Sequence, residues 1–150
     1  MPIEILLGLG NPAELQYVQS LVECEDVEVL GAASESPELV SLAVHLQPAV
    51  VILGQSMPPT GALEIAREIY DLCPDTHVIL LTQHTAEDYV IAAFRSGIRG
   101  YVVEDDAAAV LARAIREVSR GRLFMSPSAT RGLTEAYLPQ AVGAPPEIPQ

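Results

Sequence analysis

The chain has 150 residues, of which 49% are hydrophobic and 5% aromatic. This is enough apolar material for one domain with a real core, and it excludes general disorder. No apolar run reaches the roughly 20 residues that a membrane span requires, so we expect a cytoplasmic protein with no membrane partner. Two cysteines, Cys24 and Cys73, are too few for a disulfide framework and are expected to be reduced.

Charge is distributed unevenly along the chain. It carries 20 acidic and 8 basic residues, for a net charge of −12, and every basic residue is arginine. Residues 1–66 contain no basic side chain, whereas seven arginines lie between Arg95 and Arg131. Binding to a phosphate backbone requires several basic residues on one face. We therefore expect contact with DNA only through a downstream domain of a longer protein.

Short aliphatic and β-branched runs predict five buried strands, and the residues between them have helical spacing. The strands are expected at 3–7, 27–31, 50–53, 78–82 and 101–103. The first two helices are expected to begin at Asn11-Pro12 and Ser36-Pro37, as N-cap and first helical residue. The other three helices are expected at about 61–72, 86–96 and 106–120, the last two ending before Gly97 and Gly121.

Alternation of five strands with five helices predicts an α/β fold with a doubly wound, five-stranded parallel sheet. In such sheets the ligand crevice lies beyond the carboxyl ends of the strands. Functional residues are therefore expected just after Leu7, Leu53, Leu81 and Val103. We assign residues 1–122 to this domain and 123–137 to a short C-terminal helix that begins at Ser126-Pro127. Residues 138–150, with four prolines in 13 residues, have the composition of a linker to a missing DNA-binding domain.

A glycine-rich turn follows the first strand and admits two interpretations. The segment Gly8–Ala13 fits the pattern G-x-G-x-x-A of dinucleotide-binding turns. Pro12, however, lacks one of the N–H groups that hold a pyrophosphate at a helix N-terminus. A tight strand-to-helix turn is the alternative, and it is the interpretation that we favour.

Several segments occur in an order and spacing typical of one family. They are Val50–Pro58 followed by Thr60-Gly61, Cys73–Thr76, Val78–His84, Ser96–Glu104, and Gly121 followed by Ser126-Pro127. Over about residues 3–132 the chain resembles the receiver domains of response regulators of the NarL/FixJ type. These carry a LuxR-like helix-turn-helix downstream. The resemblance implies a flavodoxin-like sheet with strand order 2-1-3-4-5 and a role in two-component signal transduction.

The resemblance also implies where reactive residues should stand. The family has a phosphoacceptor Asp after the third strand, two Mg²⁺-binding carboxylates after the first, and a Lys after the fifth. This sequence has Gly54 at the acceptor position, Leu9 and Gly10 at the acidic pair, and Glu104 at the Lys position; only Thr82 is retained. Because Mg²⁺ sites use carboxylates and phosphoryl transfer needs neutralised charge, we expect no Mg²⁺, no phosphorylation and no catalysis.

Two further groups of residues have alternative interpretations. Thr82 and Tyr101 match the positions that couple phosphorylation to a surface change in the family. The alternative, which we favour, is that Thr82 ends a strand and Tyr101 packs at a sheet edge. A second group combines arginines and carboxylates on the fourth helix, fifth strand and fifth helix: Arg95, Arg99, Arg113, Arg116, Asp105 and Asp106. These form either a solvated mixed-charge face or the interface of a homodimer.

The leading hypothesis is a non-phosphorylatable receiver that regulates transcription through dimerisation. The alternative is a module that senses a small ligand or a protein partner in the altered crevice. A nucleotide-binding enzyme using the glycine-rich turn is a third candidate. The three histidines are scattered in the sequence, and no metal site is expected.

Overall fold

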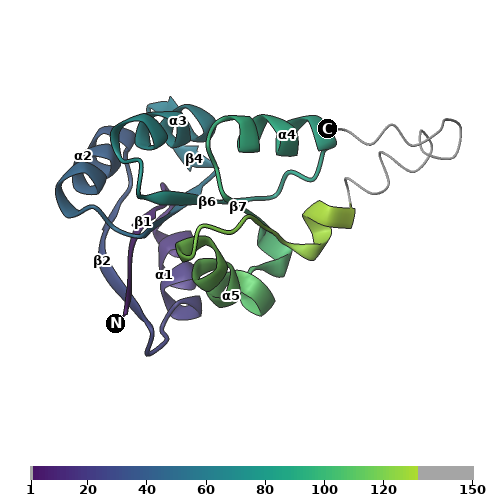
Figure 1. Cartoon of the computed structure of the whole chain (residues 1–150), viewed down its shortest axis with the longest axis horizontal. Coiled ribbons are helices and arrows are strands. Elements are labelled where there is room, and N and C mark those ends of the chain that lie inside the picture. Colours follow the sequence, from purple (N-terminus) through teal and green to yellow (C-terminus); the bar gives the residue numbers. More distant parts are fainter. Residues whose placement is uncertain (1, 132–150) are drawn as a thin grey trace, which may run out of the picture.

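The computed structural model describes residues 2–131, which form a parallel sheet covered by helices on both faces (Figure 1). The sheet has the order β2-β1-β3-β6-β7-β8, and all five pairings are parallel. The strands are β1 (Ile3–Gly8), β2 (Val27–Ala33), β3 (Val50–Gly54), β6 (His77–Thr82), β7 (Gly100–Val103) and β8 (Phe124–Met125). The predicted order 2-1-3-4-5 is confirmed, and β8 adds a sixth strand at the edge.

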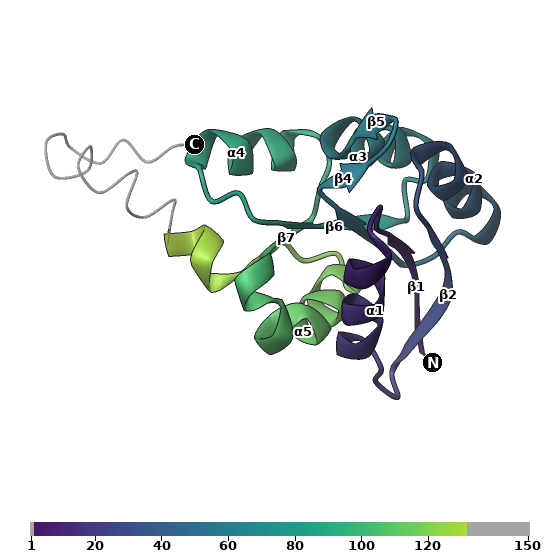
Figure 2. The same cartoon turned by 180° about the vertical axis from the view of Figure 1, so that it is seen from behind.

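Five α-helices connect the strands in two layers. They are α1 (Pro12–Leu21), α2 (Ser36–Leu46), α3 (Ala62–Leu72), α4 (Glu87–Arg95) and α5 (Ala107–Ser119). Helices α2, α3 and α4 cover one face of the sheet, and α1 and α5 cover the other (Figures 1 and 2). Side chains alternate between the two layers along each strand. On β1, for example, Leu6 packs with the first layer, and Ile5 and Leu7 pack with the second.

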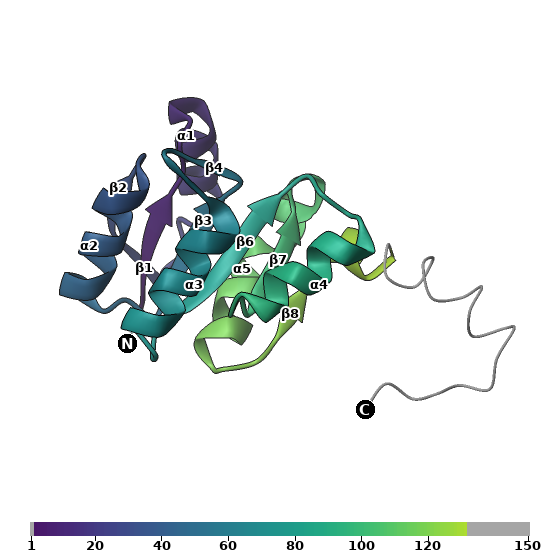
Figure 3. The ribbon, with the colours of Figure 1, turned by 90° about the horizontal axis from the view of Figure 1, so that it is seen from above.

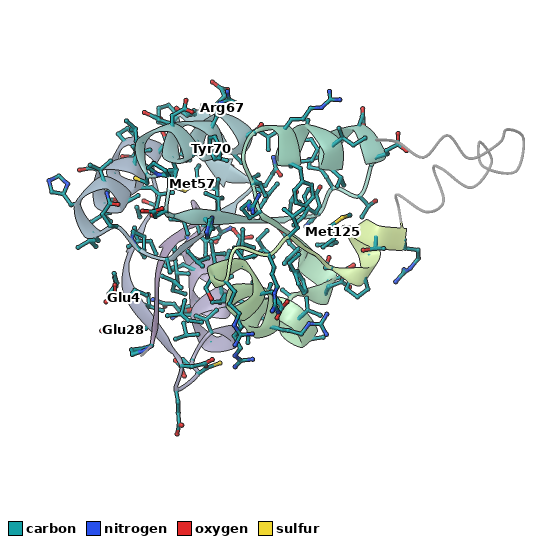
Figure 4. The ribbon with its side chains drawn as sticks, in the orientation of Figure 1. Glu4, Glu28, Met57, Arg67, Tyr70 and Met125 are labelled. Atoms are coloured by element: carbon teal, nitrogen blue, oxygen red, sulfur yellow. The ribbon has the colours of Figure 1, made fainter. Side chains whose placement is uncertain are left out.

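The strand β2 differs from the prediction of uniformly buried strands. It lies at the edge of the sheet, and its side chains are mostly exposed or half-buried. Glu28 lies opposite Glu4 of β1 in the register, and both side chains are exposed (Figure 4). An edge strand has a neighbour on one side only, so polar side chains remain in water there.

One predicted helix start is correct and the other is displaced by one residue. The side chain of Asn11 accepts from the N–H groups of Ala13 at 2.8 Å and Glu14 at 3.4 Å, which confirms the N-cap of α1. In α2 the N-cap is Glu35, and Ser36 is already helical and buried. The N–H of Ser36 donates to the carbonyl of Pro58 at 2.8 Å, so a tertiary contact replaces the expected side-chain cap.

The ends of the last two helices agree with the sequence. Gly97 and Gly121 have φ angles of 96° and 82°, in the left-handed region that favours glycine after a helix. The segment that follows Gly121 differs from the expected short helix at 123–137. Phe124 and Met125 form the strand β8, paired in parallel with β7 (Figure 3). Two residues are too few to produce a recognisable strand pattern.

A helix does begin after Ser126, and residues 127–131 are helical. The remainder of that predicted helix and the predicted linker at 138–150 lie outside the described residues.

A small antiparallel hairpin, unpredicted from sequence, follows β3. It consists of β4 (Ser56–Met57) and β5 (Thr60–Gly61), and it lies beside the N-terminal end of α1 (Figure 3). Met57 is buried, whereas Ser56 and the two prolines of the turn are exposed. The hairpin therefore stands over the carboxyl ends of β1 and β3, where the sequence predicts the functional crevice.

Candidate functional site

A polar pocket of about 600 Å³ lies at the carboxyl ends of the central strands. It is lined by Asn11, Glu14, Gln55, Ser56, Thr82, Gln83, His84 and Glu104. These residues come from the N-cap and first turn of α1, from the last residue of β6, and from the segments that follow β3, β6 and β7. The position agrees with the predicted crevice, and none of the lining residues is Lys or Arg.

Leu9, Gly10 and Gly54, the small or apolar residues predicted at this end of the sheet, have different surroundings. Leu9 is only 1% exposed and belongs to the core with α1 and α5. Gly10 lies under the hairpin, where a Cβ would overlap the carbonyl oxygen of Ser56. A phosphate group approaching the backbone of Gly10 would meet the same oxygen, which counts against the dinucleotide-binding interpretation of the turn.

Gly54 ends β3 and is closely surrounded. A Cβ at this position would lie 2.7 Å from Leu9 Cδ2 and 3.1 Å from Glu14 Oε1. Real Cβ atoms do not approach other atoms this closely, so any larger residue at position 54 requires Leu9 to move. The end of β3 thus has no room for a longer side chain in this packing.

Two neighbouring carboxyl groups line the pocket. Glu14 belongs to the first turn of α1, and Glu104 begins a 3₁₀ turn (Glu104–Asp106) after β7. Burial, together with the charge and hydrogen bonding of Glu104, raises the pKa of Glu14. Glu104 also accepts a hydrogen bond from Gln83 Nε2 at 3.1 Å. The pocket is therefore electronegative and unsuited to an anion.

A hydrogen-bonded group centred on Gln55 occupies the floor of the pocket. The hydroxyl of Thr82, which is fully buried, donates to Gln55 Oε1 at 2.6 Å. Gln55 Nε2 donates to the hydroxyl of Tyr89 on α4 at 2.8 Å. The same Thr82 oxygen accepts from the N–H of His84 at 3.2 Å. Both functional groups of the amide are thus engaged.

Tyr101 connects this group to β7. Its side chain is fully buried, and its hydroxyl donates to the carbonyl of His84 at 2.7 Å. Burial raises the pKa of Tyr101 far above its ordinary value, so the phenol stays protonated and acts as a donor. The structure therefore links Thr82 and Tyr101, the two predicted switch positions, through His84.

The arginines and carboxylates of the predicted dimer face are mostly engaged within the chain. Arg116 pairs with Asp26 at 2.6 Å, and this pairing lowers the pKa of Asp26. Arg113 lies 5.2 Å over the ring of Phe124, and Arg99 donates to the carbonyl of Gly121 at 2.9 Å. The side chains of Arg95 and Asp105 are exposed.

Asp106 joins the end of β7 to the C-terminal segment. Its carboxylate accepts from the N–H of Ser128 at 2.8 Å and from the Ser128 hydroxyl at 2.9 Å. Burial alone would raise the pKa of Asp106, but hydrogen bonds from Ser128 and Ser126 outweigh it and lower the pKa. The N–H of Ser128 at the start of the new helix is thus satisfied by a carboxylate 22 residues away.

The sequence did not identify Glu14, Gln55 or Tyr89 as site residues. Glu14 could have been found, because it follows Asn11 in the first turn of a helix that begins at the crevice. The sequence gives no comparable signal for Tyr89, because an aromatic residue at helical spacing is typical of a core position. Its hydroxyl reaches Gln55 through the tertiary placement of α4.

Other chemistry-bearing residues are dispersed. Cys73 is buried, and burial raises the pKa of its thiol, while Cys24 is half-buried. Within residues 2–131 no group of three or more His, Cys, Asp or Glu side chains is arranged to hold a metal ion. None of the helices in the same range is long and apolar enough to cross a membrane.

Comparison with curated proteins finds bacterial transcription regulators. The chain is 30% identical over 137 residues to the transcriptional regulatory protein YxjL of Bacillus subtilis, covering 90% of this chain and 63% of that protein. It is 30% identical over 115 residues to the oxygen regulatory protein NreC of Staphylococcus carnosus, covering 76% of this chain and 53% of that protein. The chain thus spans only part of the length of these relatives.

Solved structures share the fold. A LuxR-family two-component response regulator from Aurantimonas has a TM-score of 0.85 at 24% identity, covering 92% of this chain and 99% of that one. The RcsB response regulator of Salmonella typhimurium has a TM-score of 0.83 at 24% identity, covering 91% of this chain and 69% of that one. Residues 10–116 match the family described as the response regulator receiver domain. This match extends over most of the chain, which therefore belongs to the response regulator receiver domain family.

Proposed function

We propose that this chain is a receiver domain that is not phosphorylated and that regulates transcription through its oligomeric state. It would be the N-terminal part of a longer response regulator that contacts DNA through a downstream domain. The curated relatives are longer proteins of this regulatory kind, and a structure of RcsB in complex with DNA is among the fold's neighbours.

The observation that carries the proposal is the packing at the ends of β1 and β3. Leu9, Gly10 and Gly54 stand where the family resemblance puts the acidic pair and the phosphoacceptor, and none can bind Mg²⁺ through a side chain. Leu9 fills the space beside Gly54, and the hairpin fills the space over Gly10. Glu104 adds negative charge where the family has Lys, so an incoming phosphoryl group would be repelled.

The proposal is tested by incubating the domain with Mg²⁺ and either acetyl phosphate or beryllofluoride. We expect no mass increase from acetyl phosphate and no beryllofluoride-dependent change in the amide NMR spectrum. A receiver that retains its acceptor Asp is the positive control. Stoichiometric formation of an acid-stable, base-labile acyl phosphate would contradict the proposal.

Dimerisation is the second part of the proposal, and α5 is the favoured element. Its outer face carries Ala108, Ala109 and Arg113 in exposed positions, and Leu123, just beyond α5, is 62% exposed. Exposed ion pairs contribute only about 0–1 kcal/mol each, so apolar burial must supply most of the affinity. Arg113 makes no ion pair within the described residues, whereas Arg116 is already bound to Asp26. Arg113 is therefore the better candidate to face a carboxylate of a second copy.

Sedimentation of the wild-type domain at high micromolar concentration and low salt tests this part. We expect a dimer that weakens modestly with added salt and shifts toward monomer in Arg113→Glu. Arg67→Glu, on the opposite layer, is the matched control and should leave the dimer unchanged. A wild-type monomer under these conditions would contradict dimerisation through this domain.

A ligand-sensing module is the second candidate function, and the pocket of about 600 Å³ favours it. A lining of amides, hydroxyls and carboxylates suits a neutral or cationic polar molecule. Titration with nucleotides and polar metabolites, followed by amide NMR, separates the two candidates. Saturable shifts confined to the pocket residues would favour sensing over constitutive dimerisation.

A further inference from the structure

The side chain of Gln55 lies in the pocket between the end of β6 and α4. Its oxygen accepts from Thr82 at the end of β6 at 2.6 Å, and its nitrogen donates to Tyr89 on α4 at 2.8 Å. Thr82 is fully buried, and Gln55 and Tyr89 are half-buried. Hydrogen bonds in such surroundings are less exposed to competition from water than those at the surface.

A continuous series of hydrogen bonds leads from Gln55 to the C-terminal segment. The oxygen of Thr82 accepts from His84 N–H at 3.2 Å, and the carbonyl of His84 accepts from the Tyr101 hydroxyl at 2.7 Å. The carbonyl of Tyr101 then accepts from the N–H of Ser126 at 2.9 Å.

The series ends on the residue where β8 gives way to the following helix. The Ser126 hydroxyl accepts from Val103 N–H at 2.9 Å, and Ser126 is fully buried. Met125 pairs with Tyr101 in the register of β7 and β8. Residues 124–126 therefore dock on the strand that carries Tyr101.

We propose that Gln55 is a built-in occupant of the pocket, whose amide holds Thr82, and through His84 and Tyr101 the docked segment 124–131, in one fixed arrangement. A bound anion is not needed to engage the Thr82 hydroxyl, because the amide oxygen of Gln55 already does so. Gln55 is thus a positioning residue for the segment that leaves the domain. This inference does not depend on whether the domain dimerises or on whether it resists phosphorylation.

A pair of glutamines provides a matched test. Gln83 lines the same pocket but bonds only Glu104 among the described side chains, and it is exposed. We compare Gln55→Met with Gln83→Met, since methionine keeps the length and volume of glutamine while removing its hydrogen bonds. The readout is amide hydrogen exchange, which reports local opening.

In Gln55→Met we expect the amides of His84, Val103 and Ser126 to exchange about fivefold faster, the factor for one lost hydrogen bond of average strength. Amides of β1 serve as an internal reference and should be unchanged. Gln83→Met should match the wild type throughout. Unchanged exchange at Ser126 in Gln55→Met, or an equal acceleration in β1, would overturn the proposal.

A second variant, Gln55→Asn, provides an independent test if Gln55→Met does not fold. Gln55→Asn keeps an amide but is one methylene shorter, so it cannot reach Thr82 and Tyr89 together, and it should give the same exchange pattern. In a Tyr101→Phe background, where the series is already cut, either Gln55 variant should add no further acceleration at Ser126. Additive acceleration there would show that Gln55 and Ser126 are not connected through Tyr101, and it would also overturn the proposal.

Discussion

The pocket has two unlike halves. The half built by β1 and β3 contains buried Leu9, Gly10 and Gly54 under the hairpin, and none of these three residues has a polar side chain. The half built by β6 and β7 contains the buried side chains of Thr82 and Tyr101, which are joined to Gln55 and His84 by hydrogen bonds of 2.6–3.2 Å. Packing dominates one half and hydrogen bonding the other.

This difference shows that neighbouring strand ends of one sheet can contribute in different ways. Gly54, which ends β3, has no side chain to join the polar series, and the next residue, Gln55, supplies the contact to Thr82 instead. The four predictions below perturb one half or the other, and they are ordered from the largest expected effect to the smallest.

Leu9→Asp should lower the free energy of unfolding by about 3–5 kcal/mol, because it removes a core side chain and buries a charge without a partner. Urea denaturation measures the change. Asn11→Asp is the control, since Asn and Asp cap helices equally well, and it should have almost no effect. A loss below about 1 kcal/mol for Leu9→Asp would mean that Leu9 is not packed as described.

Gly10→Ala should lower the free energy of unfolding by about 1–3 kcal/mol, because the new methyl group would overlap the Ser56 carbonyl oxygen and displace the hairpin. Gly31→Ala, in β2, is the matched control: its nearest neighbour is a methyl carbon of Leu6 at 3.6 Å, which is ordinary contact. That substitution should be neutral or slightly stabilising. Equal changes in the free energy of unfolding at the two glycines would show that the hairpin moves aside for the methyl group at little cost.

Asp106→Ala should cost about 1 kcal/mol, the usual value for a carboxylate that satisfies the N–H groups at a helix start. The folded pKa of Asp106 is lowered, so this contribution is present above pH 3.8 and is lost as the pH falls through the folded pKa. Asp105→Ala, at an exposed neighbour, is the control. Thermal unfolding at pH 7 and pH 3 measures both variants, and a difference that persists unchanged at the lowest pH would contradict the assignment.

Glu14→Gln should raise the free energy of unfolding at pH 7 by less than about 1 kcal/mol. The folded pKa of Glu14 is raised, so its ionisation destabilises the folded state as the pH rises through 4.5 toward the folded pKa. Below pH 4.5 the variant and the wild type should become equal. Glu38→Gln, also in the first turn of a helix, should instead lose a few tenths of a kcal/mol from the helix dipole. Equal signs for the two variants would contradict the repulsion between Glu14 and Glu104.

Local sequence signals predicted much of this fold. The five main strands, the Asn11 cap and the glycines after α4 and α5 each depend on residues that are neighbours in the chain, so their physics is visible in the sequence. The hairpin after β3, the strand β8 and the displaced start of α2 were missed. The strand β8 and the start of α2 depend on distant partners, such as the Pro58 carbonyl that accepts from Ser36. The hairpin strands are two residues each, which is too short for a recognisable pattern.

For the site, the sequence alone determined which residue types stand at the strand ends: Leu9, Gly10, Gly54, Thr82 and Glu104. Their order follows from the alternation of strands and helices, which brings all carboxyl ends of a parallel sheet to one edge. Only the tertiary structure decided that Leu9 and the hairpin close the space around Gly54 and Gly10. It also decided that Gln55, Thr82 and Tyr89 share one hydrogen-bonded group. Such contacts join residues 27–34 positions apart. The pairing of β3 with β6 brings Gln55 to Thr82, and the placement of α4 brings Tyr89 to Gln55.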